Sequence, residues 1–252
     1  MKSDLVRIHH ADYQEDISFW IQSLTGLDPV LEIGCGHGRV TLPLIKAGHT
    51  VVGVDYDNEP LSYLEKTVEK LTDKTRSRIS LIQADILDYQ SSDQFGGVIV
   101  PCNTYSTFDP DARLQLLMVV HSLLDGGGSL IASVPNPRIM REIYDEIQGS
   151  DSGEAPDIER VISHPETGFP VQVSSRLRAG RNSLLWDWIY DHLRPDGEVE
   201  RSVVTVEHYP TTMEQLLGEL DQTGFEKVLC LGGYEGEEYS ADSPYLILVC
   251  GK

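Results

Sequence analysis

Short apolar runs alternate with amphipathic segments along most of the chain. Five of these runs follow one another between Pro29 and Val134, and their apolar residues are largely consecutive rather than alternating with polar ones. Strands that are covered on both faces have this pattern, so the runs predict a parallel sheet between layers of helices. The five predicted strands are VLEIG (30–34), TVVGVD (50–55), ISLIQAD (79–85), GVIVPCN (97–103) and SLIASVP (129–135).

Most of the segments between these strands have apolar residues at spacings of three and four, as on one face of a helix. The first such helix ends at Gly48, because glycine is the usual residue just beyond a helix C-terminus. A longer helix begins with Asp109 as its N-cap and Pro110 in its first turn, and we expect it to stop at the glycines of residues 126–128. Its predicted buried face is Leu114, Leu117, His121 and Leu124. Residues 90–96 are polar and predict a loop.

The pattern changes after Asn136, since residues 158–208 alternate apolar and polar positions between turn signals. This alternation predicts an antiparallel sheet inserted into the α/β chain. One face of its strands is apolar and carries Val171, Val173, Leu177, Leu184, Trp186, Trp188 and Tyr190. Asp187 and Asp191 point to the opposite face. A short helix over residues 138–150 leads into the insertion.

The α/β pattern returns near the end of the chain. Thr211 and Glu214 have the spacing of a capping box at the start of a helix, and Gly224 closes that helix. The apolar face of this helix is Met213, Leu216, Leu217 and Leu220. Two further strands, 227–233 and 244–251, are separated by too short a loop for a parallel crossover, so they predict an antiparallel hairpin at the sheet edge.

Together these elements predict an α/β fold with a Rossmann-like, seven-stranded sheet and an antiparallel β insertion before the penultimate strand pair. We expect residues 1–137 and 209–252 to form the α/β domain. Residues 138–208 form the insertion, which would serve as a substrate cap or a dimer element. A chain of 252 residues is long enough for one domain with such an insertion, as a monomer or a homodimer.

Charge and cysteine content narrow the expected partners. The 40 acidic and 20 basic residues give a formal net charge of -20 at pH 7, which repels a phosphate backbone, so nucleic acid is not an expected partner. The four cysteines are far apart without a CxxC pair, which is typical of reduced thiols and predicts neither disulfides nor a metal site. No segment is apolar over the thickness of a bilayer, so we expect a cytoplasmic protein without a membrane partner.

The most informative motif is EIGCGHG, the turn that follows the first predicted strand. Gly34, Gly36 and Gly38 allow the backbone to come close to a ligand at a helix N-terminus. Their GxGxG spacing departs from the GxGxxG fingerprint of dinucleotide sites, because Arg39 stands at the position of the last glycine. Glu32 adds to the difference, since a carboxylate repels a pyrophosphate but is tolerated beside a cation. The turn therefore favours a cationic ligand over a dinucleotide.

Acidic residues end the next two strands at the same edge of the sheet. Asp55 ends the second strand, where a carboxylate is placed to accept hydrogen bonds from both hydroxyls of a ribose. Asp85 ends the third strand, where it is placed to accept from an adenine amino group while Ile86 packs against the ring. A dinucleotide would use Asp55 in the same way, and an Asp after a strand is also a common helix N-cap. Both alternatives stay open at this point.

The motif E-x-G-x-G-x-G, the acid at the end of the second strand and A-D-I at the end of the third resemble class I S-adenosylmethionine-dependent methyltransferases. The resemblance covers the chain from Pro29 to Pro135 and from Pro210 to the end. Within the family, DYQEDISFW, NTYSTF and the β insertion resemble small-molecule N-methyltransferases, such as amino-sugar and glycine N-methyltransferases. The resemblance implies S-adenosylmethionine as cofactor and a small-molecule acceptor, with nitrogen favoured over oxygen or carbon.

Position by position, the resemblance also implies a set of cofactor contacts. Gly34 and Gly36 would line the methionine part of the cofactor, and Asp55 would bind its ribose. Asp85 and Ile86 would bind the adenine. The other residues of the expected cofactor site are Tyr13, Glu32, Cys35, Tyr56 and Pro101.

We assign no catalytic side chain, because methyl transfer from a sulfonium needs chiefly an acceptor lone pair held in line with the methyl carbon. The fourth strand ends in PCNTYSTF, where related enzymes meet the transferred methyl group, so Asn103 and Tyr105 are candidates for orienting the acceptor. Tyr13 is a candidate lid residue. Trp186 and Trp188 are an aromatic wall for a cationic amine or, more commonly, sheet core. The histidines that we expect at the surface are His37, His164, His192 and His208.

Two alternative functions remain. An NAD(P)-dependent reductase would share the strand, turn and helix, but the glycine spacing, Glu32 and the lack of a YxxxK-like proton donor count against it. A non-catalytic cofactor-binding protein would keep the same residues and lack turnover.

Overall fold

The computed structural model describes residues 2–148 and 155–252. Contacts within the chain divide it into two compact units. The larger unit is Glu15–Ile139 with Thr211–Lys252, and the smaller unit is Met1–Gln14 with Met140–Pro210. The sequence pattern assigned the first fourteen residues to the α/β domain, whereas here they group with the insertion.

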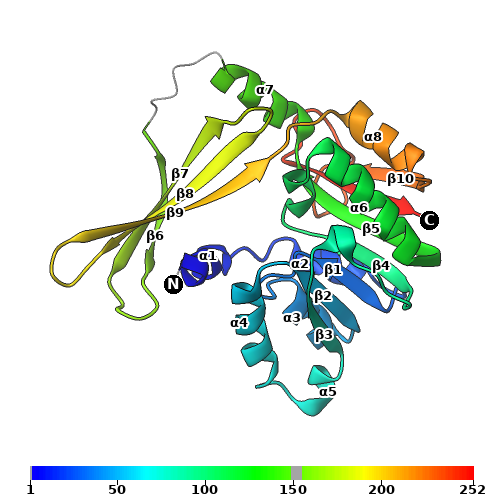
Figure 1. The fold of residues 1–252 in the computed structure, drawn as a ribbon, viewed down its shortest axis with the longest axis horizontal. Helices are drawn as coiled ribbons and strands as arrows, with labels where there is room; N and C mark the ends of the chain where they lie inside the picture. The colour runs from blue at the N-terminus through cyan, green and yellow to red at the C-terminus, as the bar shows by residue number, and fades with distance from the viewer. Residues whose placement is uncertain (1, 149–154) are drawn as a thin grey trace. The chain divides into compact units, whose positions relative to one another are not determined.

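The larger unit is built on a seven-stranded sheet (Figure 1). Its strands are β1 (Val30–Ile33), β2 (Val51–Asp55), β3 (Ile79–Gln83), β4 (Phe95–Val100), β5 (Leu124–Pro135), β10 (Glu226–Leu231) and β11 (Tyr245–Gly251). Their order is β10-β11-β5-β4-β1-β2-β3, and β11 alone runs antiparallel to both of its neighbours. The predicted Rossmann-like sheet with its terminal hairpin is therefore confirmed.

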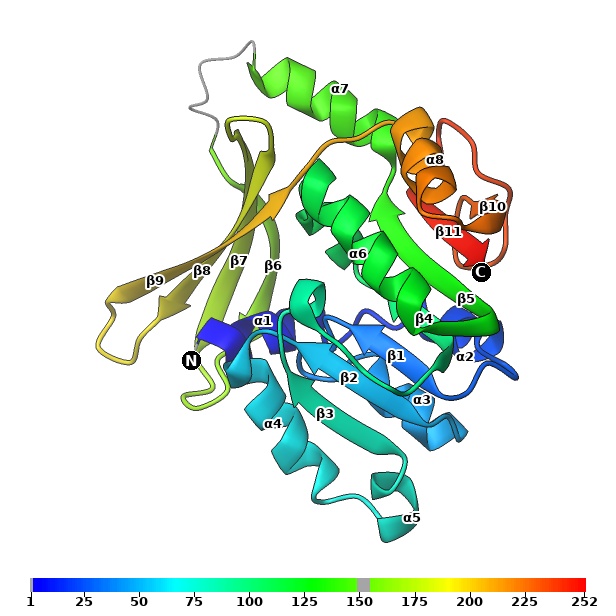
Figure 2. The ribbon, with the colours of Figure 1, turned by 45° about the vertical axis from the view of Figure 1, so that its right-hand side comes forward.

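Helices cover both faces of this sheet (Figure 2). The helices of the larger unit are α2 (Ile17–Ser23), α3 (Thr41–Ala47), α4 (Asn58–Val68), α5 (Asp73–Arg76), α6 (Pro110–Leu123) and α8 (Met213–Gln222), with the short 3-10 helices η1 (Ile86–Asp88) and η2 (Thr104–Thr107). Leucines of α6 and α8 pack with Val98 and Val100 of β4 in the main core, whereas α2 and α3 pack with Ile99 on the other face. None of the described helices is long and apolar enough to cross a membrane.

The buried face and the end of α6 differ from the prediction. Its buried residues are Arg113, Leu116, Leu117, Val120 and Leu123. The prediction was wrong because it placed the charged Arg113 on the exposed face of the helix. Arg113 is buried, where it forms an ion pair with Glu219. The helix also stops before the glycines, which belong to β5. A Cβ atom at Gly128 would lie 2.9 Å from the carbonyl oxygen of Phe95, so glycine lets β5 approach β4 closely.

The capping box of α8 is shifted by one residue from the predicted pair. The Thr212 hydroxyl accepts a hydrogen bond from the Gln215 amide at 3.2 Å, and the Thr212 amide donates to Gln215 Oε1 at 2.9 Å. Thr211 is buried, and its hydroxyl donates to the same Gln215 oxygen. The N-cap of α8 is therefore Thr212 and not Thr211. Leu217, which was predicted on the apolar face of this helix, is exposed.

The smaller unit contains the predicted antiparallel sheet. Its strands follow one another in space as β6 (Asp157–Ser163), β7 (Pro170–Ala179), β8 (Leu184–Leu193) and β9 (Val199–His208). The helix α1 (Lys2–His10) packs on the apolar face through Leu5, and Nδ1 of His9 lies 3.1 Å from the Tyr190 hydroxyl. The predicted helix before the insertion is α7 (Pro137–Gln148), and residues 149–150 of that prediction lie outside the described residues.

Three of the four histidines that we expected at the surface are buried in this unit. His164 and His192 stack with their ring centroids 3.9 Å apart, and His208 lies edge-on to Trp186. The prediction was wrong because neutral imidazole rings pack well against aromatic and backbone groups. Burial lowers the pKa of His208 to about 4, so this ring is neutral near pH 7.

The opposite face of the sheet carries a buried carboxylate. Asp187 Oδ2 accepts hydrogen bonds from Arg178 at 2.6 Å and from Arg176 at 2.9 Å, and Oδ1 accepts from the Thr205 hydroxyl at 2.8 Å. The Arg178 guanidinium in particular holds the pKa of Asp187 well below its usual range. One carboxylate thus ties the three adjacent strands β7, β8 and β9 together.

We expect Asp187→Ala to lower the free energy of unfolding by about 2 kcal/mol, because it leaves the partners of a buried carboxylate unpaired. The matched variant Asp191→Ala removes a carboxylate that pairs with the well-exposed Arg201, and it should cost about 0.5 kcal/mol. Urea denaturation followed by tryptophan fluorescence measures both.

The pH dependence follows from the lowered pKa of Asp187. Its stabilisation should be complete above the ordinary carboxyl pKa of 3.8 and should disappear only as the pH falls through the lowered value. Equal effects of the Asp187 and Asp191 substitutions at pH 7 would contradict this account.

Candidate functional site

The turn after β1 is shaped by three glycines with left-handed backbones. Their φ angles are +74° at Gly34, +50° at Gly36 and +83° at Gly38, in the region that favours glycine. A Cβ atom at Gly34 would lie 3.0 Å from the Thr104 side chain, whereas one at Gly36 would meet nothing closer than 3.9 Å. Gly34 is therefore required by packing, whereas Gly36 leaves the turn open on that side.

Asp55 connects this turn to the end of β2. Its Oδ2 accepts a hydrogen bond from the Gly36 amide at 2.8 Å, and its Oδ1 accepts from the Asp57 amide at 2.9 Å. Partial burial raises the pKa of Asp55, and these two amides oppose the rise. The carboxylate is thereby fixed beside the glycine turn. Tyr56, the next residue, is 80% exposed.

Two of the other acids at this edge cap helices. The Asp57 side chain accepts from the Glu59 amide at the start of α4, and the Asp85 side chain accepts from the Leu87 amide at the start of η1. Asp85 is exposed, and the adjacent Ile86 is buried in the main core. Asp55 differs from both, because it does not serve as an N-cap.

Glu32 lies inside the sheet beneath the turn. Its strand pairs with β2 on one side and β4 on the other, and its side chain is 1% exposed. The Thr41 hydroxyl at the start of α3 donates to Glu32 Oε2 at 2.7 Å. Burial raises the pKa of Glu32 to about 8. Cys35 is also buried, with its side chain against Gly53 and the apolar face of α4.

The segment after β4 carries a strained turn. After the buried Pro101, Cys102 and Asn103 both have left-handed backbones, with φ of +59° and +61°. Such angles are uncommon for residues other than glycine and cost energy. Among the described residues, the buried side-chain oxygen Oδ1 of Asn103 finds no hydrogen-bond donor. Thr104 then packs against Gly34.

Tyr105 and Tyr13 occupy positions unlike that of Asn103. Tyr105 is 1% exposed and forms part of the main hydrophobic core. This burial argues against a direct contact between Tyr105 and an acceptor. Tyr13 belongs to the smaller unit, whereas the other predicted site residues belong to the larger unit.

An ion pair that the sequence did not predict lies beside the glycine turn. Arg39 donates to both oxygens of the fully buried Asp16, at 2.6 and 2.7 Å, and also to Sγ of Cys102 at 2.6 Å. The Trp20 indole donates to the same carboxylate. Arg39 therefore connects the chain before α2 to the strained turn after β4. The sequence offered one signal, an arginine in place of the last glycine of the dinucleotide fingerprint.

Among the described residues, no three His, Cys, Asp or Glu side chains are placed to hold a metal ion together.

We expect Glu32→Gln to stabilise the ligand-free protein. A carboxyl whose folded pKa is raised loses stability as the pH rises from its unfolded pKa of about 4.5 to its folded pKa of about 8. The variant should therefore gain stability over wild type steadily as the pH rises through this window, by at most about 5 kcal/mol at about 1.4 kcal/mol per pKa unit, and little more above pH 8. Urea denaturation at several pH values measures the difference, with the exposed Glu65→Gln as control. A difference that does not change with pH would contradict the assignment.

Residues 30–128 match a family model described as a methyltransferase domain. Ribosomal RNA small subunit methyltransferase A of Porphyromonas gingivalis is 39% identical over 69 residues, which are 27% of this chain and 24% of the relative. The match thus spans about a quarter of the length of that curated relative. Cypemycin N-terminal methyltransferase of Streptomyces sp is 25% identical over 233 residues, which are 91% of this chain and 86% of the relative.

Solved structures of methyltransferases have a similar fold over nearly the whole chain. An S-adenosylmethionine-dependent methyltransferase from Clostridium acetobutylicum superposes with a TM-score of 0.76 at 15% identity, over 97% of this chain and 94% of the other. The sugar N-methyltransferase KedS8 from Streptoalloteichus sp gives 0.73 at 17% identity, over 100% and 92%. Residues 30–128 of the larger unit are therefore similar to a methyltransferase domain, and the chain has the fold of solved S-adenosylmethionine-dependent methyltransferases.

Proposed function

We propose that the protein transfers a methyl group from S-adenosylmethionine to the nitrogen of a small-molecule amine. The observation that carries this proposal is the hydrogen bond from the Gly36 amide to Asp55, at the carboxyl ends of β1 and β2. Ligands of open α/β sheets bind at this edge. Gly36 is open on the side of its missing side chain, and the neighbouring carboxylate keeps lone pairs for ribose hydroxyls.

The charges around the turn suit a cationic donor better than a dinucleotide. Asp16, Glu32 and Asp55 lie near one another, and Arg39 is paired with Asp16. No cation among these four groups remains for a pyrophosphate, and Asp55 would repel one. The sulfonium and ammonium groups of S-adenosylmethionine would meet carboxyl groups instead.

S-adenosylmethionine supplies an electrophilic methyl group: the acceptor nitrogen bonds to the methyl carbon while the carbon–sulfur bond breaks, and the sulfur keeps the electron pair as a neutral thioether. The protein must orient the acceptor lone pair and exclude water. Asn103 is our candidate for the orienting group, because its buried Oδ1 lacks a donor and an amine N–H would supply one. The proton that the new ammonium group releases goes to water, and no side chain is assigned as base.

The remaining contacts are proposed from the family resemblance. Gly34 and Gly36 contact the methionine part, Asp55 binds the ribose, and Asp85 with Ile86 binds the adenine. Besides these residues, the proposed cofactor site includes Glu32, Cys35, Tyr56 and Pro101, whereas Tyr13, a residue of the smaller unit, stays a prediction from the sequence. The geometry supports backbone rather than side-chain contacts from Cys35, since its thiol is buried against Gly53 and α4.

Two observations support a small amine as acceptor. The sugar N-methyltransferase and the cypemycin N-terminal methyltransferase both align with most of this chain. The ribosomal RNA methyltransferase matches only 69 residues, and a net charge of -20 disfavours an RNA substrate. A screen of amino sugars, amino acids and peptide N-termini with S-adenosylmethionine, read by release of S-adenosylhomocysteine, tests this proposal. Turnover of RNA or of hydroxyl compounds alone would overturn it.

Asp55→Ala should weaken S-adenosylmethionine binding about tenfold or more, because two charge-assisted hydrogen bonds to the ribose are lost. Isothermal titration calorimetry measures the dissociation constant. Asp57→Ala is the matched control, since it removes the same charge two residues away and costs only the N-cap of α4. Binding that is equal in the Asp55 variant and wild type would refute the assigned role.

Asn103→Ala should remove a preference for sinefungin, an analogue in which an amine-bearing carbon replaces the sulfonium and its methyl group. If Asn103 Oδ1 accepts a hydrogen bond at the methyl position, wild type binds sinefungin more tightly than S-adenosylhomocysteine, and the variant loses about tenfold of that ratio. Asn103→Asp keeps the acceptor and tolerates the left-handed backbone, so it should keep the ratio. A ratio that is unchanged in Asn103→Ala would contradict the proposal.

A further inference from the structure

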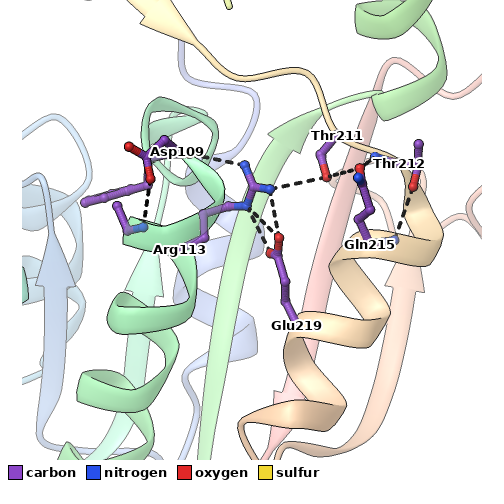
Figure 3. Close-up of polar contacts among 8 residues, drawn as sticks. Asp109, Arg113, Thr211, Thr212, Gln215 and Glu219 are labelled. Carbon is purple, nitrogen blue, oxygen red and sulfur yellow. Dashed lines mark hydrogen bonds and ion pairs between the residues drawn. The ribbon is translucent and has the colours of Figure 1, made fainter. Parts of the chain in front are cut away.

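A buried ion pair joins α6 to α8 (Figure 3). Arg113 is 2% exposed, and its Nε and Nη2 donate to Glu219 at 2.9 and 2.8 Å. Its other donor, Nη1, reaches the carbonyl oxygen of Phe108 at 3.1 Å. Nη2 also lies 3.5 Å from the Thr211 hydroxyl. One guanidinium therefore contacts two helices and the segments that precede them.

Stability alone is a weak reason for such a pair. Removing two charges from water is costly, and apolar residues of similar volume often replace a buried ion pair without loss of stability. The pair has a second effect, because the guanidinium group is planar and its N–H donors point in fixed directions. Each hydrogen bond therefore holds its acceptor in a defined position. The acceptors of these hydrogen bonds therefore indicate which segments the ion pair holds in place.

The Phe108 carbonyl belongs to the segment that leads from the strained turn to α6. Phe108 is the C-terminal cap of η2, which begins one residue after Asn103. Within η2, Thr104 packs against Gly34 of the cofactor turn. Tyr105 is buried, and burial together with the negative charge of Glu219 raises its pKa. The ion pair therefore contacts the end of η2 through Phe108, and its charges act on the buried Tyr105 in the middle of η2.

We propose that Arg113 and Glu219 are positioning residues that hold η2, and through it the Asn103 side-chain oxygen, in the conformation that the methyl-transfer site requires. The Arg113 hydrogen bond to Phe108 fixes the end of η2, and the Thr104 contact with Gly34 fixes its beginning. Without the first constraint, the left-handed backbone at Cys102 and Asn103 is free to relax. This inference rests on the proposed function in that it assigns Asn103 to the methyl position.

The test uses the double variant Arg113→Met with Glu219→Leu, which removes both charges and fills their volume. A purely structural role predicts that this variant, if it remains as stable to urea as wild type, behaves like wild type. Our proposal predicts two changes at unchanged stability. The peptide spanning residues 103–109 should exchange its amide hydrogens about tenfold faster in the ligand-free protein, and the sinefungin to S-adenosylhomocysteine affinity ratio should fall about fivefold.

Two further variants keep the experiment decisive if the double variant is unstable. Arg113→Lys retains a charge for Glu219 but loses the rigid fork that also reaches Phe108, so it should show the same two changes more weakly. Arg138→Met is the matched control, because Arg138 likewise joins an ion pair to a backbone carbonyl, of Ala241, elsewhere in the larger unit. It should show neither change.

The outcomes separate the two proposals. If wild type binds neither S-adenosylhomocysteine nor sinefungin, the proposed function fails, and hydrogen exchange still reports whether the ion pair holds η2. If wild type binds both compounds, and the Arg113 variants leave exchange of residues 103–109 and the affinity ratio unchanged, the positioning role is wrong while the proposed function stands.

Discussion

The hydrogen bond from the Gly36 amide to the Asp55 carboxylate joins the carboxyl ends of two neighbouring parallel strands. Parallel pairing of β1 with β2 brings these ends to the same edge of the sheet, and the left-handed glycines turn the chain there. The same carboxylate also accepts from the Asp57 amide, where α4 begins. One side chain therefore fixes both the turn that leads to α3 and the start of α4, so the edge is organised before a ligand binds.

Buried ionisable groups reinforce this edge from three sides. Arg39 with Asp16 joins the chain before α2 to the turn after β4, and Arg113 with Glu219 contacts the end of η2. Glu32 lies beneath the glycine turn and accepts a hydrogen bond from Thr41, the first residue of α3. Burying each of these groups costs desolvation energy, and each forms directional hydrogen bonds that fix a segment in place. These buried groups thus fix the positions of the segments that surround the proposed cofactor site.

The sheet could be predicted because its signals are local. Consecutive apolar residues, capping residues and a short loop before the last strand are visible in any window of the sequence. The buried face of α6 could not be predicted in this way, because Arg113 is buried only by virtue of Glu219, 106 residues later. The same holds for Arg39, whose partner Asp16 belongs to another element. Asp55 was identifiable as a candidate from its position after a strand, whereas the orphaned oxygen of Asn103 became visible only in three dimensions.

The most direct test of the central claim is a crystal structure of the protein with S-adenosylhomocysteine. The account predicts ligand density over the turn of residues 34–38, with both ribose hydroxyls within hydrogen-bonding distance of the Asp55 carboxylate and the amino acid part near Gly34 and Gly36. Density for the ligand at another part of the molecule, or a nicotinamide dinucleotide bound over this turn, would contradict it.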